Sequence, residues 1–330
     1  MIRNAKIVAS GMFVPEKVIP NLYFNELLGE DVDTWLQENL TIKERRWCNE
    51  NQSTADLCVK AANDILNNAK INSIELDLLI IATDTPEYIS PSTASVVQYR
   101  LGATNAGTFD VNTACAGFVT ALDIASKYIR ADKKYNKVLI IGAYAMSKYL
   151  NFEDKKTVTL FADGAAGVLL TSTETENEGL LTSRLYTEGQ YADWMGIYAG
   201  GTHQPVTKKV IEQKDHLLKF VKKFPKETNP ITWTRMIKEA CDELNINPND
   251  INHYFITQIN INSIWETLDN LGVDRSKGHT IMEKYAYTGS ACIPMAFDVT
   301  NKNGLIKKDD LVLFIGSGGG LAFALSVFRM

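Results

Sequence analysis

Short runs of continuous apolar residues alternate along the chain with segments in which apolar residues recur at helical spacing. In the first half, a continuous apolar run is typical of a strand buried on both faces, and a 3.6-residue period is typical of a helix with one buried face. The runs predict strands at residues 6–10, 77–83, 108–111 and 137–142, and the helical periods predict helices over 54–66, 91–101 and 115–130. This strand–helix alternation predicts an α/β fold.

The same rhythm returns in the second half of the chain. Helices are predicted over 232–244, over 262–271 and after Pro294, with strands at 254–257, 311–315 and 322–328. The similar order indicates an internal duplication, divided at a polar stretch near 172–178 into residues 1–172 and 173–330. Residues 186–226 have no clear period and are expected to form an irregular insertion, as a loop over an active site would.

Composition narrows the class of protein. The 330 residues are 45% hydrophobic and 22% charged, which is enough apolar material for a large core. The formal net charge is −5 with both signs interspersed, so no nucleic-acid partner is expected. We find neither a signal-peptide pattern nor an apolar run of the roughly 20 residues that a membrane helix needs. We therefore expect a cytoplasmic protein without a membrane partner.

The five cysteines are widely spaced, odd in number and without a Cys-x-x-Cys pair. This pattern does not favour a disulfide framework or a zinc site, and it is typical of a reducing compartment. No metal site is expected.

Cys115 stands where a predicted strand ends and a predicted helix begins. A thiol at that point faces unpaired N–H groups and the positive end of the helix dipole, which would lower its pKa and favour the thiolate. Ala114, Ala116 and Gly117 leave room for a substrate carbonyl. Taken alone, a cysteine before a helix is more typical of a buried structural residue.

Four further segments change that interpretation. Residues 114–118 read Ala-Cys-Ala-Gly-Phe, 33–35 read Asp-Thr-Trp, 161–166 read Phe-Ala-Asp-Gly-Ala-Ala and 316–320 read Gly-Ser-Gly-Gly-Gly. A further segment, residues 42–46, reads Ile-Lys-Glu-Arg-Arg. In the order and spacing of these segments, the chain resembles the β-ketoacyl-acyl-carrier-protein synthase III family of thiolase-like enzymes, and the resemblance extends from about residue 3 to the C-terminus.

The resemblance implies a five-layer αβαβα thiolase fold, a homodimer, and an acyltransferase that uses Cys115 as nucleophile. It implies an oxyanion hole made by the backbone N–H groups of Cys115 and Gly319, and a stack of Trp35 on the adenine of coenzyme A. Glycine lets a backbone donor approach a substrate closely, and fixed donors stabilise a tetrahedral oxyanion. No cofactor is expected besides the thioester substrate, carried by coenzyme A or by an acyl carrier protein.

Two positions depart from the family pattern. Gln258 stands where the family has a histidine, and Tyr287 where it has an asparagine. Glutamine is no general base, but its amide and the tyrosine hydroxyl are both hydrogen-bond donors and could rebuild the site that holds an enolate oxygen. Alternatively, Tyr287 fills and blocks the malonyl site. A third interpretation makes Gln258 a bonded polar residue at a strand end and Tyr287 a core aromatic residue.

The substrate-binding positions differ as well. Asn39 and Ser263 replace arginines that contact coenzyme A or the carrier, and Ser90 replaces a bulky residue that the dimer partner inserts at the acyl pocket. An acyl carrier protein is then the expected donor. His203, in the insertion, either reaches the site or is a solvated loop residue.

A run of lysines lies in the insertion with Phe220, Val221 and Phe224 between them. Carrier proteins are acidic, so the run could be a docking surface, although a solvated amphipathic helix face is the more usual meaning of such a pattern. The lysines are Lys208, Lys209, Lys214, Lys219, Lys222, Lys223 and Lys226.

Three hypotheses follow. In the first, Cys115 takes an acyl group from a thioester and condenses it with a malonyl-carrier acceptor in fatty-acid or polyketide-type biosynthesis, in two covalent steps. In the second, the acyl group passes to another nucleophile without decarboxylation. In the third, the chain is a helper subunit of a heteromeric synthase.

Overall fold

The computed structural model describes residues 3–175 and 177–330 and contains two mixed β-sheets. The first sheet has the order β1-β7-β6-β4-β5 and the second the order β11-β12-β13-β8. Their strands are β1 (Asn4–Phe13), β4 (Leu78–Ala82), β5 (Gly107–Val111), β6 (Lys137–Ala145), β7 (Asp163–Thr173), β8 (Gly179–Thr187), β11 (His253–Ile256), β12 (Leu311–Gly318) and β13 (Ala322–Arg329). Two small two-stranded antiparallel sheets are also present. In one, β2 (Lys17–Pro20) pairs with β3 (Glu44–Trp47), and in the other β9 (Met195–Gly196) pairs with β10 (Lys219–Phe220).

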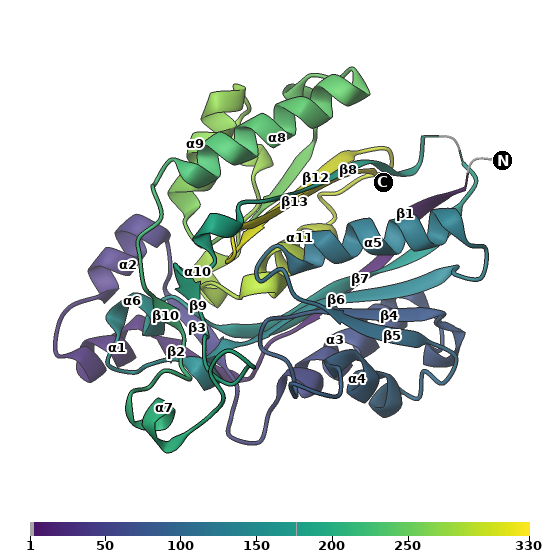
Figure 1. The fold of residues 1–330 in the computed structure, drawn as a ribbon. Helices are drawn as coiled ribbons and strands as arrows, with labels where there is room; N and C mark the ends of the chain where they lie inside the picture. The colour runs from purple at the N-terminus through teal and green to yellow at the C-terminus, as the bar shows by residue number, and fades with distance from the viewer. Residues whose placement is uncertain (1–2, 176) are drawn as a thin grey trace.

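Helices cover the sheets in layers, and Figure 1 shows α5 and α11 between the two sheets. Outside the first sheet lie α3 (Thr54–Ala69) and α4 (Thr93–Leu101); between the sheets lie α5 (Gly117–Ala131) and α11 (Cys292–Lys302); outside the second lie α8 (Thr228–Leu244) and α9 (Ile261–Leu271). Shorter helices are α1 (Asn21–Leu28), α2 (Asp33–Leu40), α6 (Lys155–Val158), α7 (Lys208–Glu212) and α10 (Met282–Tyr285). The expected five-layer αβαβα thiolase fold is confirmed.

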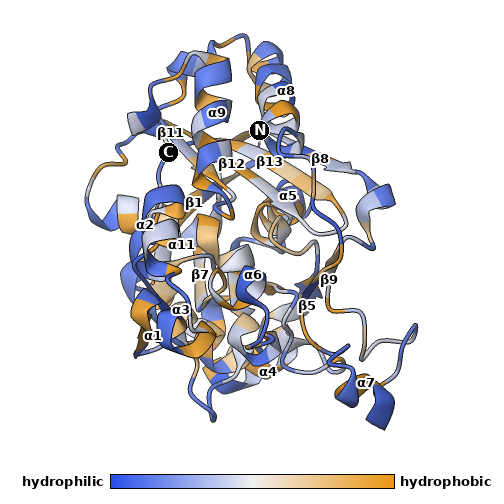
Figure 2. Cartoon of the chain, turned by 90° about the vertical axis from the view of Figure 1, so that its left-hand side faces the viewer, coloured by the Kyte–Doolittle hydropathy of each residue, from blue (hydrophilic) through white to orange (hydrophobic). Residues whose placement is uncertain are grey.

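The packing follows from the hydropathy of each layer. Every residue of β4 is buried, and α5 buries ten of its side chains because it contacts both sheets. In Figure 2 the strands of the sheets are mostly white and orange, whereas the outer helices α8 and α9 alternate blue and orange faces. Apolar faces on both sides of each sheet therefore hold the layers together.

The two sheets repeat one topology. In the first, β4 pairs parallel with β6, and β7 then pairs antiparallel with both β6 and β1. In the second, β11, β12, β13 and β8 repeat that pattern strand for strand. The polar stretch near 172–178 connects β7 to β8. The division of the chain into units 1–172 and 173–330 stays a prediction.

Some observed helix boundaries differ by a few residues from those predicted from the sequence. The helix expected from residue 115 begins at Gly117, and α8 begins four residues before residue 232. The helix expected after Pro294 begins at Cys292, because proline is tolerated in a first helical turn, where its missing N–H has no intrahelical partner. The part of the chain that the structure describes contains no helix long and apolar enough to cross a membrane.

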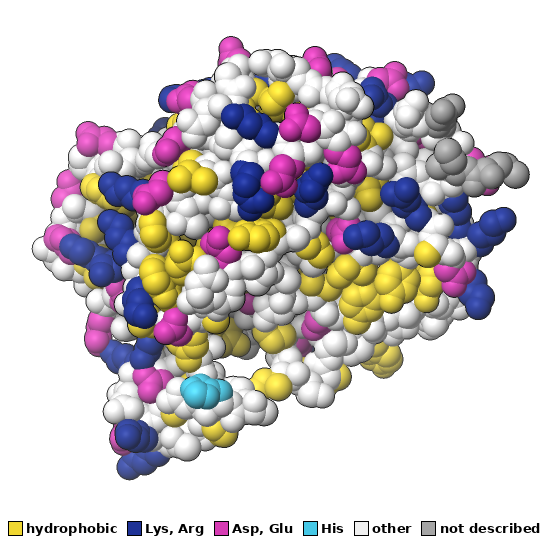
Figure 3. All heavy atoms as spheres, turned by 45° about the horizontal axis from the view of Figure 1, so that its top comes forward, with side chains coloured by type: hydrophobic (Ala, Val, Ile, Leu, Met, Phe, Trp, Pro, Cys, Tyr) yellow, Lys and Arg dark blue, Asp and Glu magenta, His cyan; other side chains and the backbone are white. Residues whose placement is uncertain are grey.

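Charges on the surface are mixed, as the composition indicates. Figure 3 shows Lys and Arg side chains interspersed with Asp and Glu over the face in view, without a continuous field of one sign.

A partly buried chain of three side chains lies at the edge of the second sheet. His253 Nδ1 lies 2.8 Å from His279 Nε2, His253 Nε2 lies 3.1 Å from Asp310 Oδ2, and the His279 ring stacks on Phe255. Burial, followed by the neighbouring imidazole, lowers the pKa of His279 to about 4. The folded protein therefore keeps this ring neutral at pH values where an unfolded chain would protonate it.

We predict that the free energy of unfolding falls as the pH drops from about 6.5 towards 4. Over this range His279 is protonated in the unfolded state and stays neutral in the folded state, so acid favours unfolding. His279→Gln should remove about 1–2 kcal/mol of this pH-dependent change, allowing for the partial exposure of the ring. Chemical denaturation at several pH values measures it. His203→Gln, at an exposed loop position, is the control and should keep the wild-type profile. Equal profiles for wild type and His279→Gln would contradict the prediction.

Candidate active site

Cys115 lies just before α5, and its side chain is 2% exposed. The chain reaches it from β5 through Ala114, whose φ of 46° is in the left-handed region, and Ala116 then caps the helix without a side-chain hydrogen bond. This sharp turn directs the thiol away from the helix and into the base of a pocket that Cys115 lines.

The glycine-rich end of β12 lies directly on the backbone of this turn. A Cβ added to Gly318 would stand 2.4 Å from Thr113 O and 2.7 Å from Cys115 N, and one added to Gly316 would stand 2.9 Å from Ala116 Cα. These separations are too short for any side chain. Only glycine therefore allows the two halves of the sheet system to meet here.

The N–H groups of Cys115 and Gly319 are free of backbone acceptors in the described part of the chain. Gly319 lines the same pocket as Cys115. Two free donors beside a nucleophile are what an oxyanion hole requires. The role that the sequence predicts for them stays a prediction.

Burial has the largest effect on the pKa of Cys115. Desolvation raises the pKa of the Cys115 thiol well above its ordinary value, and the Asp84 carboxylate raises it further. The lowered pKa expected from the sequence is therefore wrong for this structure, because the thiol precedes the helix in an apolar, water-poor setting. The resting nucleophile is a thiol.

Tyr287 lies over the thiol. Its side chain is 1% exposed, and its hydroxyl, acting as a donor, lowers the pKa of Cys115 against the larger effect of burial. Backbone hydrogen bonds join Tyr287 N to Leu160 O at 3.0 Å and Ala162 N to Tyr287 O at 2.9 Å. Its ring therefore has a fixed position between Phe161, with centroids 5.6 Å apart, and the nucleophile.

Gln258 is held away from the pocket. Its Oε1 accepts from Ile281 N at 2.9 Å, and its Nε2 is 3.4 Å from His279 O. The side chain is fully buried and does not line the pocket of Cys115. This geometry matches the alternative of a bonded polar residue at a strand end. The catalytic role predicted for Gln258 has no contact here to support it.

The pocket of Cys115 has a volume of about 380 Å³. Cys115, Tyr287 and Gly319 line its base. Residues of the insertion and of the second half form its walls and mouth: Met195, Phe220, Lys223, Phe224, Lys226, Asn229, Asn260 and Ser263.

Comparison with known proteins agrees with the geometry. Residues 109–189 match the family 3-oxoacyl-[acyl-carrier-protein (ACP)] synthase III, and residues 241–330 match its C-terminal region. The chain is 35% identical over 334 residues to the beta-ketoacyl-[acyl-carrier-protein] synthase III of Clostridioides difficile, covering 100% of this chain and 99% of that one. The chain belongs to the 3-oxoacyl-acyl-carrier-protein synthase III family.

Two further relatives extend the match. The synthase III of Natranaerobius thermophilus is 35% identical over 332 residues, covering 99% of each chain. The crystal structure of the Aquifex aeolicus 3-oxoacyl-[acyl-carrier-protein] synthase III superposes with a TM-score of 0.88 at 29% identity, covering 99% of this chain and 100% of that one. As a member of the synthase III family, the chain is an acyltransferase of the thiolase fold.

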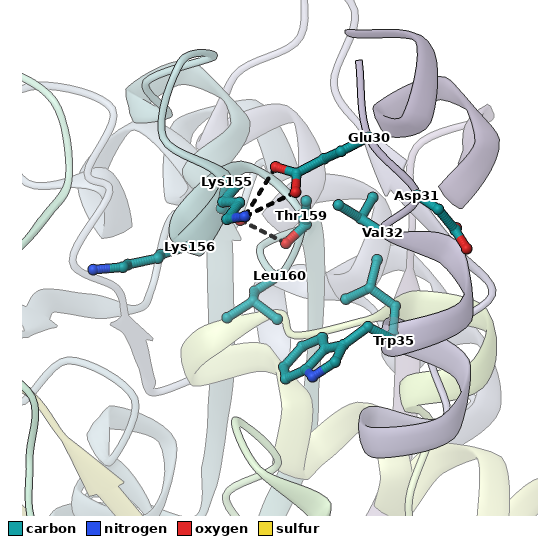
Figure 4. A pocket seen from close by; sticks show the side chains of 9 residues that line it. Glu30, Asp31, Val32, Trp35, Lys155, Lys156, Thr159 and Leu160 are labelled. Carbon is teal, nitrogen blue, oxygen red and sulfur yellow. Dashed lines mark hydrogen bonds and ion pairs between the residues drawn. The ribbon is translucent and has the colours of Figure 1, made fainter. Parts of the chain in front are cut away.

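Trp35 separates this pocket from a second one. It lies on α2 with 55% of its side chain exposed and lines both cavities. Figure 4 shows its indole facing Leu160 in the second pocket, which has a volume of about 460 Å³. Lys155 Nζ contacts Glu30 there at 2.9 Å. A flat aromatic face beside a lysine suits a planar ligand.

The other substrate positions are not all at the pocket. Ser263 lines it, whereas Asn39 bonds through Nδ2 to Trp35 O at 2.9 Å and lines neither cavity. Ser90 is exposed on a loop next to Ile89, which is 84% exposed. His203 is exposed and does not line the pocket of Cys115.

The lysine run is not one amphipathic helix, so that interpretation is wrong. The chain forms the five-residue α7, the two-residue β10 and turns between them. Lys208 pairs with Glu212, Lys214 with Glu153, Lys219 with Asp215 and Lys222 with Asp193. Lys223 and Lys226 have no ion-pair partner among the described residues and line the mouth of the pocket.

The sequence reasoning missed Asp84 and Tyr144, two polar residues beside the nucleophile. Asp84 acts electrostatically on both Cys115 and Tyr144. The sequence contains a signal that could have identified Asp84. Asp84 follows the fully apolar β4, and polar residues at the carboxyl ends of parallel strands commonly lie at functional sites.

We predict that Gly318→Ala disrupts the site through the contact with Thr113 and Cys115. The variant should lose about 1–3 kcal/mol of stability from overpacking, and acylation of Cys115 should fall about 100-fold because the turn must shift. Thermal unfolding and intact-protein mass measure the two effects. Gly189→Ala is the control, since a Cβ there meets no atom within 4 Å. Acylation at the wild-type rate in Gly318→Ala would contradict the prediction.

Proposed function

We propose that this protein takes an acyl group from a carrier-bound thioester onto Cys115 and condenses it with a malonyl-carrier acceptor. The observation that carries the proposal is the convergence of a buried thiol, two free backbone donors and a pocket open to solvent at one end. The covalent intermediate divides one difficult substitution into two easier ones. The names of the family relatives, all synthases acting with acyl carrier protein, support it.

The acylation step uses groups that the pocket supplies. The thioester carbonyl carbon approaches the thiol, and its oxygen approaches the N–H groups of Cys115 and Gly319. Those two donors stabilise the negative charge of the tetrahedral intermediate because they are fixed and water-poor. Collapse of the intermediate releases the carrier thiol through the mouth of the pocket and leaves acyl-Cys115.

The condensation step has fewer donors. Loss of CO₂ from a malonyl group leaves an enolate, whose oxygen needs hydrogen-bond donors. Gln258 is engaged by the backbone of His279 and Ile281, so Tyr287 is the side-chain donor that remains over the thiol. This geometry favours a second candidate, transfer of the acyl group to a different nucleophile without decarboxylation.

Carrier binding is proposed at the mouth of the pocket. Lys223 and Lys226 stand there without acidic partners in the described chain, while the family's arginine is replaced by Ser263. The two lysines can attract the phosphate of a phosphopantetheine arm and the acidic surface of the carrier. A cytoplasmic homodimer, implied by the resemblance to the family, is part of the same proposal.

We expect intact-protein mass spectrometry to show one acyl group added by an acyl-carrier or acyl-coenzyme A donor. Cys115→Ala should gain no mass, and Cys241→Ser, a buried cysteine of α8 outside the pocket, should gain it as the wild type does. Added malonyl-carrier protein should then remove the acyl group and form a 3-oxoacyl product.

The outcomes separate the candidates. No mass gain in the wild type, or a gain that survives Cys115→Ala, rejects both enzymatic functions and leaves the helper subunit. An acyl adduct that malonyl-carrier protein never discharges rejects condensation and retains the second candidate.

We predict that Lys223→Glu with Lys226→Glu lowers kcat/KM for a carrier-bound donor about 10-fold at low salt, because like charges then repel the acidic carrier. The deficit should shrink in high salt. A small acyl thioester without a carrier or phosphate should react as with the wild type. Lys208→Glu with Lys209→Glu, both exposed on α7 and outside the pocket, is the charge-matched control. Equal losses for both donors would contradict carrier docking at this mouth.

A further inference from the structure

Three buried oxygen atoms in the surroundings of Cys115 have no oxygen or nitrogen partner for a hydrogen bond among the described residues. They are Asp84 Oδ1, Tyr144 OH and Tyr287 OH, and of these Tyr287 OH acts on the Cys115 thiol alone. Leaving such a group unpaired in the interior is unfavourable, because it has lost its hydrogen bonds to water. Three together beside a nucleophile indicate a function that requires them there.

The position of Asp84 is fixed by the ends of three neighbouring strands. It follows β4, which lies between β5 and β6. Thr83 N donates to Val111 O at 3.1 Å, and Ala145 N donates to Thr85 Oγ1 at 2.9 Å. The loop of Asp84 is thus clamped between the strand that leads to Cys115 and the strand that carries Tyr144.

Tyr144 is acted on by the Asp84 carboxylate and packs against the second half of the chain. Its ring packs so closely on Gly289 that a Cβ there would stand 2.5 Å from the ring. Gly289 follows Tyr287 by two residues, and Phe161 lies beside both tyrosine rings, with centroid separations of 6.2 Å and 5.6 Å. The two tyrosine rings therefore pack on the same phenylalanine, and the Asp84 carboxylate acts electrostatically on Tyr144 and on Cys115.

These three side chains include a weak base but no cation. Burial raises the pKa of Asp84 to about 6, and no described lysine, arginine or histidine lowers it. The groups that act on its neighbours are acids: Asp84 raises the pKa values of Cys115, Tyr144 and Tyr149, and Asp163 and Cys292 also raise that of Tyr144. Gln258, at the position of the family's histidine, cannot accept the thiol proton.

We propose that Asp84 is the general base that accepts the proton of the Cys115 thiol as the sulfur attacks the thioester. This inference rests on the acyl transfer proposed above. The S–H bond breaks and its proton passes to the Asp84 carboxylate, while Sγ bonds to the carbonyl carbon. When the carbon–sulfur bond to the carrier breaks, the departing thiolate takes that proton back, so charge and atoms balance.

The electrostatics of the site suit this exchange. While Asp84 is ionised, its charge disfavours a second negative charge on Cys115, so the resting thiol stays protonated. Once Asp84 holds the proton it is neutral, and the repulsion disappears as negative charge develops on sulfur. One negative charge is present throughout. A base with a pKa near the working pH is the most effective kind.

Asp84→Asn tests the proposal because two rates should move in opposite directions. Alkylation of Cys115 by iodoacetamide needs only the thiolate, so removing the neighbouring charge should speed it several-fold at pH 8. Acylation by an acyl-carrier donor, which needs the base, should slow by about 10- to 1000-fold. In the wild type the acylation rate should rise through a pH near 6; in the variant this rise should vanish.

Controls make each result decisive. Glu16→Gln, an exposed carboxylate outside the pocket, should match the wild type in both rates, and thermal unfolding confirms that Asp84→Asn is folded. Acylation that is unchanged or faster in Asp84→Asn, or that keeps the rise near pH 6, overturns the proposal. So does a parallel loss of both rates, which indicates a structural role. Absence of acylation in the wild type instead rejects the proposed function itself.

Discussion

The site depends on one close backbone contact between the two halves of the chain. The end of β12 lies on the turn of Cys115 at a distance that no side chain larger than hydrogen permits at Gly318 or Gly316. That contact sets the distance between the thiol and the Gly319 N–H, and it also seats α5 between the two sheets. Preorganised donors stabilise a developing charge only when their positions are fixed in this way.

The same close packing determines the electrostatics of the nucleophile. Bringing two sheets and two helices together removes water from Cys115, and this desolvation has the largest effect on the pKa of the thiol. A buried thiol then needs a proton acceptor nearby. In this chain the glutamine at the family's histidine position is bonded to the backbone, so Asp84 becomes the group on which ionisation depends.

The fold, and the place of Cys115 between a strand and a helix, could be predicted from the sequence because both have local signals. The apolar run of β4 and the small residues around Cys115 are readable in a single stretch of chain. The orientation of Gln258 was not readable, because it depends on backbone groups of Ile281 and His279, more than twenty residues away. The ionisation of Cys115 likewise depends on burial by both halves, which no local pattern contains.

The repeated topology explains why a tyrosine stands over the thiol. Cys115 follows Ala114 and precedes α5; Tyr287 follows Ala286 and precedes α11, and both alanines have a φ of 46°. A non-glycine residue in this region is strained, so the same strained turn occurs in both halves and aims the next side chain into the shared interior. The two residues therefore face each other as equivalent positions of a duplicated fold. A change at residue 287 necessarily acts on the nucleophile, and Tyr287 contributes a hydroxyl where a smaller residue would leave space for an acceptor.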